Sequence, residues 1–189
     1  TFNAKKAGTY TGSGVLSSEG ASTVTINLSG TANPKQTSKE IYKLVSAVTS
    51  GSQYLIVSTN AAGLGNALSG SSSNTISNNT VTVKTGDPGD GNSCTYIEDP
   101  NTYSIWTSAT SGSSMTFAIN GYYLYHNSAT LSLSTATSKN TWTVGTNATT
   151  LYYTGGGTRY LTCSSGTWSI TSSSSNVYFY EKTTVNIPE

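Results

Sequence analysis

The feature that most constrains the fold is a succession of short runs in which apolar and polar residues alternate. Clear examples lie at residues 23–28, 54–58, 80–84 and 115–119. Alternation with a period of two places the apolar side chains on one face of a β-strand. Clusters of Gly, Asn and Ser separate the runs, and these residues adopt tight-turn conformations at little cost. The pattern predicts an all-β fold, either a barrel or a sandwich of short antiparallel strands.

Runs of the same kind continue to the end of the chain, at residues 122–125, 131–134, 142–144, 150–153, 160–163, 167–170 and 177–181. Asn120-Gly121 separates two of these runs and predicts a hairpin turn. Only residues 38–48 have apolar side chains at helical spacing. That stretch is compatible with a helix or with a strand that leads through a turn into the next strand.

A faint internal repeat adds a more specific alternative. Trp106 precedes a Tyr-Leu pair by 17 residues, and Trp142 precedes another by 18. Recurring units of this kind indicate pseudo-repeated hairpins, and three of them would close a β-trefoil. A trefoil-like arrangement is therefore one form that the barrel can take.

The composition favours a folded chain and excludes several classes of partner. Hydrophobic residues make up 34% and charged residues 9%, but 13 Tyr and 3 Trp are far more aromatics than disordered segments carry. The net charge of +1, without a basic cluster, predicts no nucleic-acid binding. No apolar run reaches 18 residues, so we expect no membrane insertion.

The chain divides at Pro34. Residues 1–34 contain one good strand and no Trp, and they end in an Asn-Pro breaker. We interpret them as a strand-bearing extension, either an edge strand pair or the remnant of a preceding domain. Residues 35–189 are predicted to form a single all-β module that is monomeric.

Candidate catalytic groups are sparse, and we expect no enzyme. The only histidine, His126, is expected in a loop or at a strand end with a solvated ring. A serine hydrolase needs a base beside its nucleophile, and no Gly-x-Ser-x-Gly turn accompanies this histidine. The eight acidic residues are scattered, whereas a glycosidase needs two carboxylates across a cleft.

Two weaker sites remain open. Asp87, Asp90 and Asn92 supply oxygen ligands of the kind that Ca²⁺ prefers, although their spacing departs from known calcium loops. A solvated acidic turn is the alternative, and no other cofactor is predicted. Cys94 and Cys163 allow one disulfide.

The aromatic residues suggest the most specific function. Exposed Trp and Tyr rings stack on the apolar faces of sugars, and Asn, Asp and Ser bind the hydroxyls at the rim. Trp106, Trp142 and Trp168 recur at matched places and are predicted core residues. Strand alternation should expose some of the remaining rings, so the candidate ligand-binding residues are Tyr122, Tyr125, Tyr152, Tyr153 and Tyr178.

The order of aromatic and aliphatic runs between Ile41 and Lys182 resembles a class of β-rich accessory modules. These modules occur in large secreted or surface proteins of gut bacteria. The resemblance implies an extracellular or cell-surface location and an accessory role, and it carries over no functional residue. The expected function is binding of a ligand, foremost a glycan and otherwise a host surface protein. The alternative is a structural spacer or stalk domain of an adhesin that binds no small ligand.

Overall fold

The computed structural model describes residues 8–33, 35–70 and 75–188. The chain forms two compact units, one of Thr1–Lys39 with Asn186–Glu189 and one of Glu40–Val185. The structure is 61% strand and 3% helical, which confirms the predicted all-β class.

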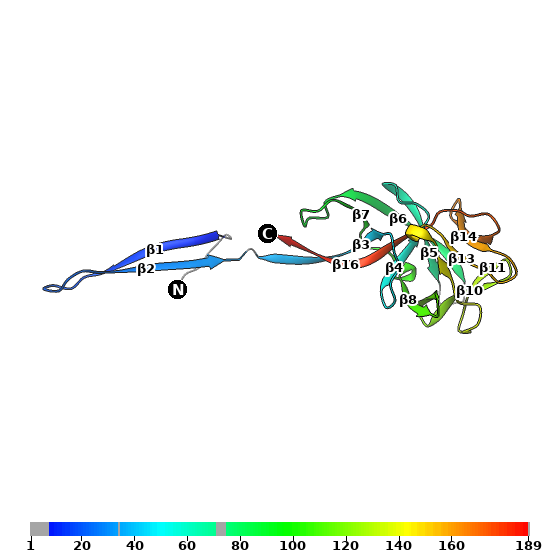
Figure 1. Ribbon diagram of the computed structural model, residues 1–189. Helices are drawn as coiled ribbons and strands as arrows, with labels where there is room; N and C mark the ends of the chain where they lie inside the picture. The colour runs from blue at the N-terminus through cyan, green and yellow to red at the C-terminus, as the bar shows by residue number, and fades with distance from the viewer. Residues whose placement is uncertain (1–7, 34, 71–74, 189) are drawn as a thin grey trace. The chain divides into compact units, whose positions relative to one another are not determined.

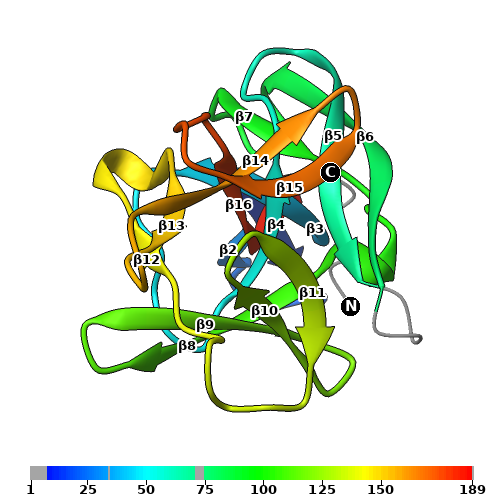
Figure 2. The same cartoon turned by 90° about the vertical axis from the view of Figure 1, so that its right-hand side faces the viewer.

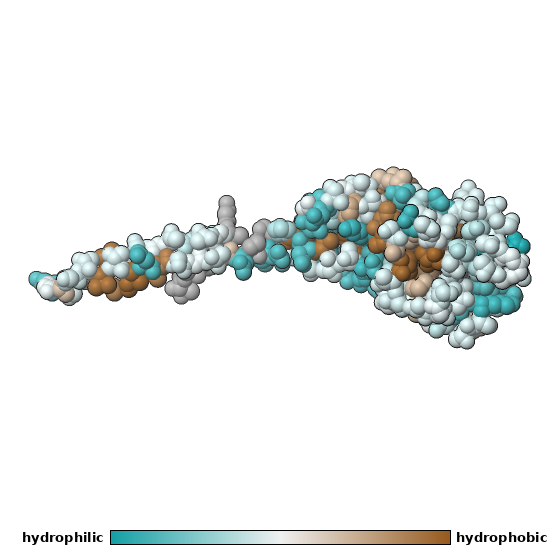
Figure 3. Space-filling view, in the orientation of Figure 1, coloured by the Kyte–Doolittle hydropathy of each residue, from teal (hydrophilic) through white to brown (hydrophobic). Residues whose placement is uncertain are grey.

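The smaller unit contains an antiparallel hairpin of β1 (Gly8–Leu16) and β2 (Val24–Ala32), drawn in blue in Figure 1. The pairing runs from Gly8 opposite Ala32 to Leu16 opposite Val24, so that every second pair shares a face. One face therefore carries Leu16, Val24 and two further aliphatic residues of β2, which are 45–62% exposed. This apolar stripe is visible as brown surface along the hairpin in Figure 3.

The described residues form fourteen further strands: twelve lie wholly within the larger unit, and β3 and β16 each lie partly within it. They are β3 (Gln36–Val45), β4 (Gln53–Val57), β5 (Gly63–Gly70), β6 (Ile76–Gly86), β7 (Cys94–Ile97), β8 (Trp106–Ser111), β9 (Ser114–Ile119), β10 (Tyr122–Asn127), β11 (Thr130–Ser134), β12 (Thr143–Val144), β13 (Leu151–Tyr153), β14 (Arg159–Ser164), β15 (Thr167–Thr171) and β16 (Tyr178–Pro188). Two short 3₁₀ turns, Thr102–Ser104 and Thr146–Ala148, complete the described structure.

Six of these strands close into a ring. The sheet order β4-β16-β3-β7-β6-β5 returns to β4 through the pairing of Val57 with Ala67. The ring encloses a core whose members come from all six strands: Tyr42, Leu55, Val57, Ala67, Val81, Val83, Ile97 and Tyr180. The predicted barrel is therefore present.

A second core lies on the other side of β4. Tyr54 and Ile56 face it, whereas Leu55 and Val57 face the ring interior. Because β4 is buried on both sides, its sequence QYLIV reads as an almost continuous apolar run. The second core is covered by β8–β11, which extend from the ring, and by the separate sheet β12-β13-β14-β15 (Figure 2).

The three tryptophans lie in this second core, as predicted. Trp106 and Trp142 are fully buried and Trp168 is 7% exposed. Each indole N–H donates a hydrogen bond, as buried indoles require: Trp106 to the Leu68 carbonyl, Trp142 to the Leu124 carbonyl and Trp168 to Asn78 Oδ1.

The ambiguous stretch 38–48 is not helical: residues 38–45 belong to the paired strand β3, and residues 46–48 lie beyond its end. The threefold repeat of a trefoil stays a prediction, since the pairings establish a six-stranded ring with an extension and a separate four-stranded sheet.

Candidate functional site

The five predicted ligand-binding tyrosines do not form one surface. Tyr122 and Tyr178 pack against the second core and the ring core, respectively. Tyr153 is 5% exposed and belongs to the second core. Four of the five, all but Tyr153, are partly exposed, but only Tyr125 and Tyr152 lie on strand faces opposite buried neighbours. Alternation along the strands therefore places these five tyrosines on different strand faces rather than on one shared surface.

Tyr152 has an aromatic partner that the sequence reasoning did not select. Tyr152 on β13 stands directly opposite Tyr160 on β14 in the antiparallel ladder. The two ring centroids are 5.5 Å apart and the ring planes are inclined by 44°. Leu151 and Leu161, their neighbours along the strands, are fully buried, so the two tyrosines lie on the face of the sheet away from the core.

Threonines extend this pair into a row across all four strands of the sheet. Thr143 on β12 is opposite Tyr152, and Thr171 on β15 is opposite Tyr160. All four side chains are partly exposed. We call Thr143, Tyr152, Tyr160 and Thr171 the tyrosine row; it presents two rings with a hydroxyl at each end.

A hollow of about 420 Å³ lies elsewhere on the same unit, where β15 contacts both β6 and β11. Trp168 of β15, Leu131 of β11 and Ile76 of β6 supply its apolar lining, and Asn78 and Thr167 supply polar groups. The volume falls in the range of about 300–1,000 Å³ that small-molecule sites occupy. None of the described residues that line it is charged.

The amide of Asn78 is held in place at this hollow. Its Oδ1 accepts from the Trp168 indole at 3.4 Å, and its Nδ2 donates to Asn66 Oδ1 at 3.0 Å. Gly166, in the β14–β15 turn, has a φ of +80°, and a Cβ there would lie 3.3 Å from Asn66 Oδ1. The glycine therefore provides the left-handed turn and the space for its close approach to the amide pair.

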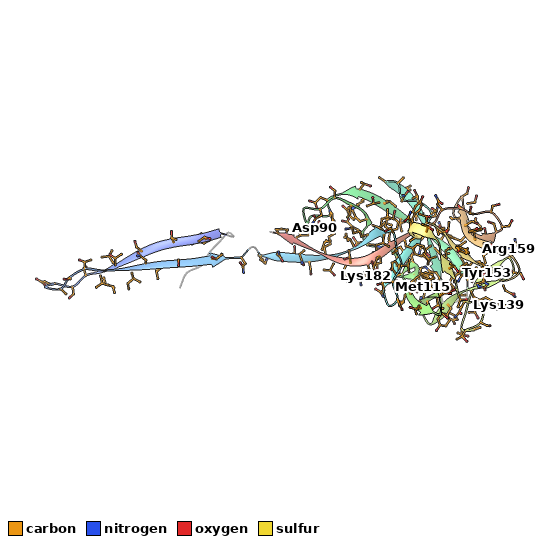
Figure 4. The ribbon with its side chains drawn as sticks, in the orientation of Figure 1. Asp90, Met115, Lys139, Tyr153, Arg159 and Lys182 are labelled. Carbon is orange, nitrogen blue, oxygen red and sulfur yellow. The ribbon has the colours of Figure 1, made fainter. Side chains whose placement is uncertain are left out.

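The expectation of a solvated His126 is wrong. The residue is 8% exposed, and its ring stacks on Tyr153 with centroids 3.5 Å apart and contacts Trp142 edge-on. Its Nε2 lies 3.2 Å from the Thr141 carbonyl, while the Tyr153 hydroxyl donates to the carbonyl of Ser128. Burial lowers the pKa of His126, and Lys139 adds a smaller effect in the same direction. Figure 4 labels Tyr153, Lys139 and Arg159 at the same end of the larger unit.

The acidic loop uses its carboxylates to bind its own backbone. Asp87 Oδ1 accepts from the amides of Gly89 and Gly91, and Asp90 Oδ1 accepts from the amide of Asn92. These backbone hydrogen bonds lower the pKa of Asp87. Among residues 8–33, 35–70 and 75–188, no three His, Cys, Asp or Glu side chains gather as metal ligands. The calcium site stays a prediction.

Both cysteines are free thiols in the structure, so they do not form the disulfide that the sequence allows. Cys94 on β7 lies within electrostatic range of Lys43 and Asp90, whereas Cys163 on β14 packs against the second core. The two thiols therefore belong to different surroundings. Burial raises the pKa of each thiol above its ordinary value.

No protein-family model matches the chain, and no curated protein or solved structure matches it. Within the described part of the chain, no helix has the length and apolar character needed to cross a membrane.

Proposed function

We propose that this chain is a non-catalytic module that binds carbohydrate, with Tyr152 and Tyr160 as its stacking surface. The module would belong to a larger secreted or cell-surface bacterial protein, with a glycan as its leading partner. The single observation that carries the proposal is the pair of facing, partly exposed rings on the outer face of the β12–β15 sheet.

The chemistry of the tyrosine row fits a sugar chain. A pyranose presents an apolar face of C–H groups, which aromatic rings bind through contact area and the negative charge of the ring face. The inclination of 44° between the rings gives a shallow, angled surface rather than a flat one. Thr143 and Thr171 lie opposite the outer edges of the two rings, where their hydroxyls can donate to and accept from sugar hydroxyls.

The structural spacer is supported by a different observation. All three tryptophans are buried, so none offers a flat exposed platform. The surface of the larger unit seen in Figure 3 is mostly pale to teal, with limited brown areas. A module whose aromatic residues serve only packing would look like this, and it would bind no glycan.

A glycan array that includes mucin O-glycans and plant polysaccharides tests the proposal. For any ligand found, Tyr152→Ala and Tyr160→Ala should each weaken binding about tenfold or more, since an aromatic contact contributes roughly 1–2 kcal/mol with its buried area. Tyr103→Ala is the matched control, because Tyr103 is 48% exposed and lies outside the tyrosine row. The absence of any glycan binding would favour the spacer. Binding that survives both row variants would overturn the assignment of this surface.

A further inference from the structure

The hollow between β6, β11 and β15 is separate from the tyrosine row, and we propose that it binds a neutral acetamido sugar such as an N-acetylhexosamine residue. Asn78 would pair with the acetamido group, and the aliphatic wall of Ile76 and Leu131 would receive the methyl group. The proposal goes beyond stacking on the tyrosine row and stands on different residues.

The uncharged lining selects a neutral ligand. The described residues around the hollow offer hydroxyls, an amide and apolar groups, and none of them carries a charge. An anionic sugar would lose part of its hydration there without gaining a paired charge, which is unfavourable. Uronic and sialic acids are therefore the wrong class for this site.

The placement of Trp168 excludes ring stacking as the main contact. The side chain is only 7% exposed, which is too little ring surface for a stacking platform. A sugar bearing only hydroxyls would gain little from Ile76 and Leu131. An acetamido group instead supplies a methyl group for the aliphatic wall and an amide for the polar side, matching both kinds of lining.

The Asn78 side chain is held in an orientation that can hydrogen-bond to the acetamido group. One N–H of its Nδ2 donates to Asn66 Oδ1, and its Oδ1 accepts from the Trp168 indole. These two hydrogen bonds fix the plane of the Asn78 amide. A primary amide has two N–H donors and two lone pairs on its oxygen, so one donor and one acceptor position remain for a ligand. An acetamido group can fill one of these positions, with its N–H donating to Oδ1 or its carbonyl accepting from Nδ2.

The three indoles provide an internally controlled test in the intact chain. In an ¹H–¹⁵N spectrum, the protein is titrated with a methyl N-acetylglucosaminide, a methyl glucoside and a methyl glucuronide. The acetamido sugar should move the Trp168 indole resonance, because that N–H bonds to Asn78 Oδ1. The indole resonances of the fully buried Trp106 and Trp142 should not shift. The glucoside should bind at least tenfold more weakly, and the glucuronide should cause no shift.

Variants separate this site from the tyrosine row. Asn78→Ala, and the nearly isosteric Asn78→Asp, should each weaken binding of the acetamido sugar at least tenfold, while Asn60→Ala, at an exposed loop position, should not. Tyr152→Ala should leave the Trp168 response unchanged, so failure of the tyrosine row and failure of the hollow are distinguishable. Equal binding of the glucoside and the acetamido sugar would overturn the assigned ligand class. The absence of a Trp168 shift with all three probes would overturn the site.

Discussion

Replacing each tryptophan with phenylalanine should give two clearly different losses of stability. Trp142 is fully buried, and its indole N–H donates to the Leu124 carbonyl at 3.0 Å. Phenylalanine removes that hydrogen bond, leaves a buried acceptor without this partner and leaves a small void where the larger ring was. The unpaired acceptor costs about 1–3 kcal/mol and the lost packing about 1 kcal/mol more. We therefore expect Trp142→Phe to lower the free energy of unfolding by roughly 2–4 kcal/mol.

The same substitution at Trp168 should cost much less. Its hydrogen bond to Asn78 Oδ1 is longer, at 3.4 Å, and it lies beside an open hollow. Water can replace the indole as a donor to Asn78 at this rim, so we expect a loss of about 1 kcal/mol. Trp106→Phe should resemble Trp142→Phe, since Trp106 is equally buried and donates to the Leu68 carbonyl at 2.9 Å.

Urea unfolding followed by far-ultraviolet circular dichroism measures all three variants on one scale. The m-value should stay constant, so that changes in the midpoint report stability. In a thermal scan, each 1 kcal/mol should appear as roughly 2–4 °C in Tm for a chain of this size. If Trp168→Phe proved as destabilising as Trp142→Phe, the distinction between core indoles and a rim indole would be refuted.

Three further predictions concern pH, packing and the thiols. Burial lowers the pKa of His126 in the folded state, so the unfolded chain binds the proton more readily. The contribution of this residue to the free energy of unfolding should be fully present above pH 6.5 and should be lost as the pH falls below it. In a series of urea midpoints measured against pH, His126→Gln should reduce this decline. Gly65→Ala should cost about 1–3 kcal/mol in the same assay, because its Cβ would lie 2.9 Å from the Thr59 side chain, whereas Gly12→Ala, which meets nothing within 4 Å, should cost little. Alkylation in denaturant without a reductant should add two labels by intact mass, and an unlabelled chain lighter by about 2 Da would show that the cysteines pair.

The strands that could be predicted are those whose alternation is strong and local. Residues 54–58 and 115–119 became β4 and β9 because one or both faces of each strand are buried. The strand β5 was not recognised, since its sequence GLGNALSG contains three glycines, which normally weaken strands. Packing explains two of them: a Cβ at Gly65 would lie 2.9 Å from Thr59 Cγ2, and one at Gly70 would lie 2.8 Å from Ile119 Cγ2. Gly63 instead has a φ of +127°, which other residues rarely adopt. Such contacts join segments far apart in the chain, and no local pattern reports them.

The candidate sites depended on the same non-local information. Alternation along the strands leaves four of the five selected tyrosines partly exposed, but the register that sets Tyr152 opposite Tyr160 is fixed by strand pairing. His126 sits beside a polar turn, and its burial comes from Tyr153, 27 residues later. The hollow at Asn78 requires β6, β11 and β15 to meet, which a linear sequence does not display.

The most direct test of the central proposal is to observe which tyrosine rings contact a bound sugar. In the complex with a glycan found on the array, nuclear Overhauser effects from tyrosine ring protons to sugar C–H protons identify the stacking surface. The account predicts effects from Tyr152 and Tyr160. Effects from Tyr123 and Tyr125 instead, the partly exposed pair on β10, would contradict it.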